Sequence, residues 1–189
     1  AFLSALFSCV LAVPVARALA RRAFPARGAL VALLGAPFIL PVIVAVMGLL
    51  AVFGQNGLVS RVSDALGGPR LDIYGVHGVV LAHVFFNLPL ATRILLQGWQ
   101  AVPVERFRLA AALGLTPWAR FRVLDWPLIA RLVPGAFAVI FVICLTSFAV
   151  ALTLGGGPRA TTVELAIYQA MRFDFDLGRA AALALIQLA

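Results

Sequence analysis

The sequence predicts an all-α protein whose helices cross a membrane several times. Of its 189 residues, 63% are hydrophobic and 12% are charged, whereas a soluble domain has about 45–50% apolar and roughly 25% charged residues. The apolar residues form long runs without charge, and arginines separate these runs. Because so few polar side chains could not cover a soluble globule, the composition excludes a soluble enzyme, a disordered chain and a secreted disulfide scaffold.

Five apolar runs define the expected spans. A hydrocarbon core of about 30 Å requires about 20 apolar residues per helix. We therefore place the spans at about 1–20, 29–53, 74–96, 132–154 and 178–189. Ala1 is not a start residue, and the first run lacks the features of a signal peptide. We expect a polytopic transmembrane bundle that is truncated at both ends and belongs to a longer protein.

The arginines predict the orientation of this bundle. Residues 17–27 and 93–131 contain ten arginines and two carboxylates, whereas the other connections contain five of each. The whole net charge of +8 therefore lies on one side, which the positive-inside rule assigns to the cytoplasm. Since the arginines separate apolar runs instead of clustering on one soluble face, we expect membrane lipid as a partner and no nucleic acid.

Four of the polar side chains within the expected spans are candidate functional residues. His83 and Asn87 are four residues apart and share a helix face, and Thr146 and Ser147 lie in the fourth run. Polar groups at membrane depth face protein or water rather than lipid, so these side chains are candidates for lining a substrate pathway. They can equally bond a neighbouring helix or their own backbone. Both interpretations stay open.

Residues 97–131 form a connection that is too long to be a simple turn. Its first part, residues 104–113, has the alternation of an amphipathic helix. Gly114 interrupts the pattern, and Thr116 and Pro117 predict the cap and first turn of a second short helix. We expect that helix to end before Pro127. Such a jointed element can bind another protein or lie on the lipid surface.

A second connection, on the opposite side, combines a turn with a helix. Gly155 to Pro158 predicts the turn, and a helix follows from Thr161 to Met171 with Thr161 or Thr162 as its cap. This connection is either a docking site for a soluble protein or a re-entrant cover of the bundle.

Catalysis is not expected of this chain. No lysine occurs, so the chain has no P-loop, and neither a zinc-protease nor a nucleophile-elbow motif is present. We predict no catalytic residue and no metal site. A secondary transporter driven by an ion gradient is an alternative class. Such a protein requires ionisable coupling groups such as carboxylates within its spans, and the expected spans contain no carboxylate.

The long connection resembles the cytoplasmic loop of ATP-binding-cassette (ABC) importer permeases. That loop has the pattern E-A-A, three residues, Gly, nine residues and I-x-L-P. In this chain, Gly114 is followed by nine residues and then by Leu-Asp-Trp-Pro at 124–127, which places the E-A-A positions at 108–110. The strings at 81–97 and 154–187 resemble the membrane subunit of the bacterial thiamine (thiamine pyrophosphate) importer, in its first half.

The resemblance implies a type I importer permease in the bacterial inner membrane, with thiamine or its phosphates as substrate. A separate ATPase would bind ATP and Mg, so that this chain needs no cofactor. A periplasmic binding protein and a second permease half would be further partners. The ATPase-coupling residues would be Arg108, Leu109, Ala110, Gly114, Leu124 and Pro127. A permease of the same architecture for ferric iron, sulfate or polyamine is the alternative.

Overall fold

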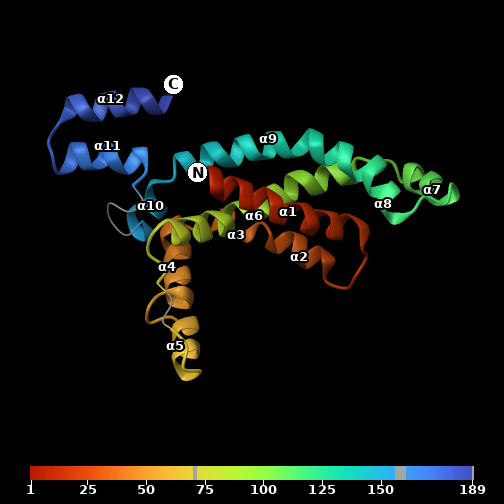
Figure 1. Ribbon diagram of the computed structural model, residues 1–189, viewed down its shortest axis with the longest axis horizontal. Helices are drawn as coiled ribbons and strands as arrows, with labels where there is room; N and C mark the ends of the chain where they lie inside the picture. Colours follow the sequence, from red (N-terminus) through yellow and green to blue (C-terminus); the bar gives the residue numbers. More distant parts are fainter. Residues whose placement is uncertain (70–71, 156–160, 189) are drawn as a thin grey trace. The chain divides into compact units, whose positions relative to one another are not determined.

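A computed structural model describes residues 1–69, 72–155 and 161–188, and every element in these ranges is helical, as the composition predicted (Figure 1). The elements are α1 (Phe2–Arg21), α2 (Arg27–Leu33), α3 (Ala36–Ile39), α4 (Val42–Phe53), α5 (Leu58–Ala65), α6 (Val76–Gln100), α7 (Val104–Ala112), α8 (Pro117–Arg120), the π-helix η1 (Phe121–Asp125), α9 (Trp126–Leu145), α10 (Phe148–Leu154), α11 (Val163–Arg172) and α12 (Leu177–Leu188).

Four helical stretches of the described residues are long and apolar enough to cross a bilayer. They are Phe2–Arg21, Val42–Ala65, Val76–Gln100 and Pro117–Leu145. The first and third lie close to the spans that we expected at 1–20 and 74–96. The helix at Leu177–Gln187 is apolar but shorter. The chain is therefore a multi-pass membrane protein.

The run at 29–53, which we expected to be one span, contains three helices. α2 ends at Leu33, α3 covers four residues, and α4 begins after Pro41. Proline has no N–H to donate and disfavours helical geometry in the residue before it, so Pro37 and Pro41 divide the run although no charge interrupts it. The stretch that can cross a bilayer starts later and includes α5.

The second short helix does not end before Pro127, contrary to our expectation. α8, η1 and α9 follow one another without a break from Pro117 to Leu145. Proline inside a helix removes one hydrogen bond and clashes with the carbonyl four residues earlier, which here belongs to Val123. The wider π-helical turn at Phe121–Asp125 contains that carbonyl and relieves the clash.

The run at 132–154 is also interrupted. α9 ends at Leu145 and α10 begins at Phe148. The Thr146 hydroxyl donates to the carbonyls of Val142 and Ile143, at 3.2 and 3.3 Å. These bonds belong to the last turn of α9, so the helix ends there with a side chain bonded to its own backbone.

The described residues form two compact units. One contains Ala1, residues 38–83 and residues 142–188. In it, α4 packs on α5 and α10, and α11 packs on α12. The backbone N–H of Gly75 donates to the carbonyl of Leu154 at 2.7 Å. Thr162 caps α11 as predicted, since its hydroxyl accepts from the N–H of Leu165 at 3.3 Å. The turn predicted at 155–158 lies outside the described residues from 156 onward.

The other unit contains residues 2–37 and 84–141, and it holds α1, α2, α7, α8, η1 and most of α6 and α9. α1 and α9 run antiparallel, because the Phe2 and Phe137 rings lie 5.4 Å apart at one end and Arg17 meets Asp125 at the other. A Cβ on Gly98 of α6 would clash with the Leu132 side chain, so α6 and α9 approach closely there.

Candidate functional site

The element predicted to couple to a partner begins with α7 and a sharp turn. Gly114 has a φ of 63°, which glycine adopts without steric cost. Its N–H donates to the carbonyl of Ala111 and the N–H of Leu115 donates to that of Ala110, at 3.0 and 3.1 Å. These two bonds form a Schellman motif that ends the helix. The predicted joint at Gly114 is confirmed.

The second helix starts as the sequence predicts. The Thr116 hydroxyl accepts a hydrogen bond from the N–H of Ala119 at 3.2 Å, and Pro117 occupies the first turn. Proline costs nothing there, because its missing N–H would have no partner within the helix. Gly114 and Thr116 therefore join the short helix α7 to the long helical stretch that begins with α8.

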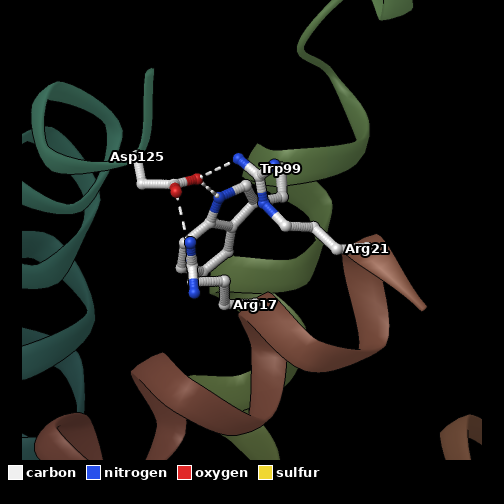
Figure 2. Close-up of polar contacts among 4 residues, drawn as sticks. All are labelled: Arg17, Arg21, Trp99 and Asp125. Carbon is white, nitrogen blue, oxygen red and sulfur yellow. Dashed lines mark hydrogen bonds and ion pairs between the residues drawn. The ribbon is translucent and has the colours of Figure 1, made fainter. Parts of the chain in front are cut away.

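Asp125 anchors this jointed element to the rest of its unit (Figure 2). Its carboxylate accepts from Arg17 Nε at 3.0 Å, from Arg21 Nη2 at 2.5 Å and from Trp99 Nε1 at 2.9 Å. Among the described residues, Asp125 is the one carboxylate that is completely buried. A desolvated charge is tolerated only when it is paired and hydrogen-bonded, and three donors from two other helices meet that requirement.

Aromatic rings hold the two arginines in place. The Arg17 guanidinium lies 5.5 Å from the centre of the Phe121 ring, and that of Arg21 lies 4.5 Å from the centre of the Phe107 ring. Both distances are within the range of cation–π attraction. The arginine side chains remain 35% and 20% exposed. We call Arg17, Arg21, Trp99 and Asp125 the buried node.

The buried node joins three helix ends. Arg17 and Arg21 lie in the last turns of α1, Trp99 lies in the last turn of α6, and Asp125 directly precedes α9. The two arginine-rich connections therefore lie at the same end of this unit, as the charge distribution predicted. Cations also suit the C-terminal end of α1 because of the helix dipole.

Asp125 was not predicted to be a site residue. In the sequence it is one of two carboxylates in the basic connections and lies outside the expected spans, and the structure places it in the continuous helical stretch Pro117–Leu145. A carboxylate flanked by apolar residues and outnumbered by arginines was the available signal.

The six predicted coupling residues lie in three places. Arg108 and Leu109 are exposed on α7, whereas Ala110 is buried. Gly114 forms the joint. Leu124 and Pro127 line one pocket of about 130 Å³. The remaining residues that line this pocket are Val102, Arg106, Val123, Leu128 and Arg131.

Apolar side chains are exposed along the same element. Six of them are more than half exposed, namely Val104, Leu109, Leu113, Trp118, Val123 and Trp126. They come from α7, from the joint and from the helical stretch that begins at Pro117. An apolar surface with such flanking arginines can fill a groove on a protein or lie at a lipid surface.

The candidate pathway residues come from two segments of the chain. His83 and Asn87 lie on successive turns of α6 and are each 3% exposed. Thr146 and Ser147 lie between α9 and α10, and the Thr146 hydroxyl is bonded to its own helix.

Comparison with solved structures defines the class of this fold. A crystal structure of a bacterial alginate ABC transporter in complex with an alginate-bound periplasmic protein matches with a TM-score of 0.76, at 17% identity, over 98% of this chain and 68% of the other. A second structure, of a bacterial ABC transporter that imports alginate, matches with a TM-score of 0.72 at 16% identity, over 98% and 72% of the two chains. The fold is that of the membrane subunit of an ABC importer.

Sequence comparison shows the family. The molybdenum transport system permease protein ModB of Azotobacter vinelandii is 30% identical over 170 residues, which cover 88% of this chain and 74% of ModB. The chain belongs to the family of ABC importer permeases. No protein-family model matches it.

Within that family, the chain is similar to the thiamine transport system permease protein ThiP. It is 51% identical to ThiP of Brucella melitensis over 188 residues, or 98% of this chain, and 51% identical to ThiP of Escherichia coli over 189 residues. The chain spans about 35% of the length of these relatives.

Proposed function

We propose that the chain is the first of two permease halves of a bacterial thiamine importer and forms part of the path for thiamine or its phosphates across the inner membrane. The observation that carries this proposal is the identity of 51% to a ThiP protein over 98% of the chain. The identity to ModB is lower, at 30%, which favours thiamine over an oxyanion as substrate. The structure neighbours support the architecture but, at 16–17% identity, not the substrate.

A separate ATPase would drive this transport, with ATP and Mg bound by that subunit. The exposed apolar side chains on α7 and α8, together with the joint at Gly114, are suited to a groove on such a partner. Arg108, Leu109, Ala110, Gly114, Leu124 and Pro127 would form the coupling surface. Arg108 stands where the family pattern has a glutamate, so its guanidinium would meet an acidic group of the ATPase.

The buried node gives this coupling a physical route. A movement imposed on α7 and α8 reaches Asp125 through the continuous helix, and Asp125 is bonded to α1 and α6. Because three helix ends share one carboxylate, they would move together. A periplasmic binding protein would deliver the substrate at the opposite side. His83, Asn87, Thr146 and Ser147 are the polar groups proposed to line the path.

Two alternative functions are a permease for another substrate and a secondary transporter driven by an ion gradient. A permease for ferric iron, sulfate, polyamine or molybdate would share the fold and the joint. A secondary transporter would need a carboxylate that is available to bind a coupling ion, but the Asp125 carboxylate already accepts from three donors. The geometry of Asp125 therefore favours a structural role over ion coupling.

The decisive experiment uses the full-length permease with its ATPase in proteoliposomes. We expect ATP-dependent uptake of labelled thiamine that unlabelled thiamine blocks and that sulfate, molybdate and spermidine do not. Gly114→Leu should abolish co-purification of the ATPase, because leucine at a φ of 63° is strained by about 1–2 kcal/mol. Gly48→Leu is the matched control, since its Cβ would meet nothing within 4 Å at an ordinary helical position.

The two parts of the proposal fail separately. ATP-dependent uptake of another solute but not of thiamine would refute the substrate and keep the class. Undiminished ATPase association in Gly114→Leu would refute the coupling role of the joint.

A further inference from the structure

A pocket between α1 and the start of the long helix is lined by four arginines and four apolar residues. Its volume is about 590 Å³, which is within the range of pockets that bind small ligands. The residues that line it are Val13, Pro14, Arg17, Ala18, Arg21, Arg22, Arg120 and Phe121. All of them belong to one compact unit. Arg17 and Arg21 also belong to the buried node, whereas Arg22 and Arg120 have no role described so far.

The positive charge of the pocket is only partly neutralised. Asp125 pairs with Arg17 and Arg21. Within the ranges that the structure describes, no carboxylate pairs with Arg22 or Arg120. The Nε atoms of Arg21 and Arg120 are buried without a hydrogen-bond acceptor among those residues. Four guanidinium groups therefore lie near a single carboxylate, which pairs with two of them. The site has both the positive charge and the hydrogen-bond donors to hold an anion.

The lining changes character along α1. Val13 and Pro14 form its apolar end, Ala18 lies one turn further, Arg21 ends the helix and Arg22 directly follows it. α1 is long and apolar enough to cross a bilayer, so the basic end of the pocket lies toward the membrane surface and the apolar end toward the hydrocarbon core. Phe121 adds apolar surface from the other wall.

A phosphate group matches the basic end of this pocket. Guanidinium groups bind phosphate oxygens through paired, charge-assisted hydrogen bonds. Basic pockets between membrane helices on the cytoplasmic side bind the headgroups of anionic lipids. A free phosphate ion would leave the apolar end unfilled, whereas a phospholipid would place its acyl chains against Val13, Pro14 and Phe121.

We propose that this pocket binds the phosphate group of an anionic phospholipid of the cytoplasmic leaflet, with Arg22 and Arg120 as its principal ligands. The proposal rests on the membrane orientation given above but not on the substrate of the importer. A lipid held here would touch both α1 and the stretch that begins with α8, and would thereby add to the attachment of the jointed element that Asp125 provides.

The test measures lipid binding to the full-length permease in detergent by native mass spectrometry. The probes are short-chain phosphatidylglycerol, phosphatidylcholine with the same chains, and inorganic phosphate. We expect phosphatidylglycerol to bind selectively. Since each arginine near the membrane surface contributes about fivefold to anionic-lipid affinity, Arg22→Gln and Arg120→Gln should each weaken binding about fivefold, and the double variant by about 25-fold.

Arg122→Gln is the matched control, because Arg122 is exposed on the same helical stretch but does not line this pocket. The Arg22→Gln variant changes an exposed side chain, so it tests the site even if Arg120→Gln unfolds. Equal affinity for the two lipids, or an equal loss in Arg122→Gln, would overturn the proposal. Full displacement of phosphatidylglycerol by inorganic phosphate would support the phosphate site but assign it to a soluble ion.

Discussion

Replacing Asp125 by asparagine tests whether the buried node holds the unit together. Asparagine has nearly the same shape but no charge, so Arg17 and Arg21 lose their counter-charge, and its amide group is a donor where the carboxylate accepted. Breaking a buried ion pair from one side costs about 3–5 kcal/mol. Because the two arginines are still 35% and 20% exposed, water can solvate them in part, and we expect a loss of about 2–3 kcal/mol, just below that range.

The assay is thermal unfolding of the full-length permease in detergent, with Asp174→Asn as the matched control. Asp174 pairs with Arg179 at 3.2 Å, but these side chains are 50% and 62% exposed. A pair of this kind contributes at most about 1 kcal/mol. We therefore expect Asp125→Asn to lower the unfolding midpoint clearly and Asp174→Asn to leave it nearly unchanged. Added salt should weaken only the exposed Asp174–Arg179 ion pair. Equal shifts in the two variants would refute the assignment of Asp125 as the anchor.

Three further substitutions have defined outcomes in the same protein. Trp99→Phe keeps an apolar ring but loses one hydrogen bond to the carboxylate, which should lower the stability by about 1.5–3 kcal/mol in thermal unfolding; no change would mean that the bond at 2.9 Å contributes nothing. Gly78→Ala should lower the stability of the permease, since its Cβ would clash with the backbone oxygen of Ile73, whereas the Cβ of Gly48→Ala meets nothing within 4 Å and should be stabilising by about 0.5–1 kcal/mol; equal unfolding midpoints of the two variants would contradict this. Thr162→Ala removes the cap of α11 at a cost of about 1 kcal/mol and should speed amide exchange in its first turn about fivefold, while Thr161→Ala should not; identical exchange rates would refute the cap.

Features that depend on a few neighbouring residues were predictable from the sequence. The caps at Thr116 and Thr162 and the turn at Gly114 each rest on bonds that span three to five residues. The chemistry of such bonds is decided by the residue types at fixed spacing. The long charge-free runs were also sufficient to predict an all-helical membrane protein, because hydropathy depends only on the composition of each run.

The structure differs from the sequence-based predictions where backbone geometry or residues far apart in the chain decide the outcome. Pro37 and Pro41 divided a run that contains no charge, whereas Pro127 did not end a helix, because a π-helical turn precedes it. Hydropathy does not distinguish these prolines. Asp125 and its donors are separated by 26 to 108 residues, so only the packing of three helices reveals that they meet.

The π-helical turn at Phe121–Asp125 sets the angular relation between the two parts of the long helix. A π-turn holds one residue more than an α-turn, and each residue of an α-helix advances by about 100° around its axis. Deleting one residue from 121–124 would restore regular geometry and leave the orientation of α8 relative to α9 nearly unchanged, because five residues of a π-turn cover about the same rotation as four residues of an α-helix. Inserting one residue into the neighbouring α-helical part would instead turn Trp118 and Arg120 by about 100° around the helix axis. Phenotypes of single-residue insertions and deletions in this segment would therefore report on register rather than on the loss of any particular side chain.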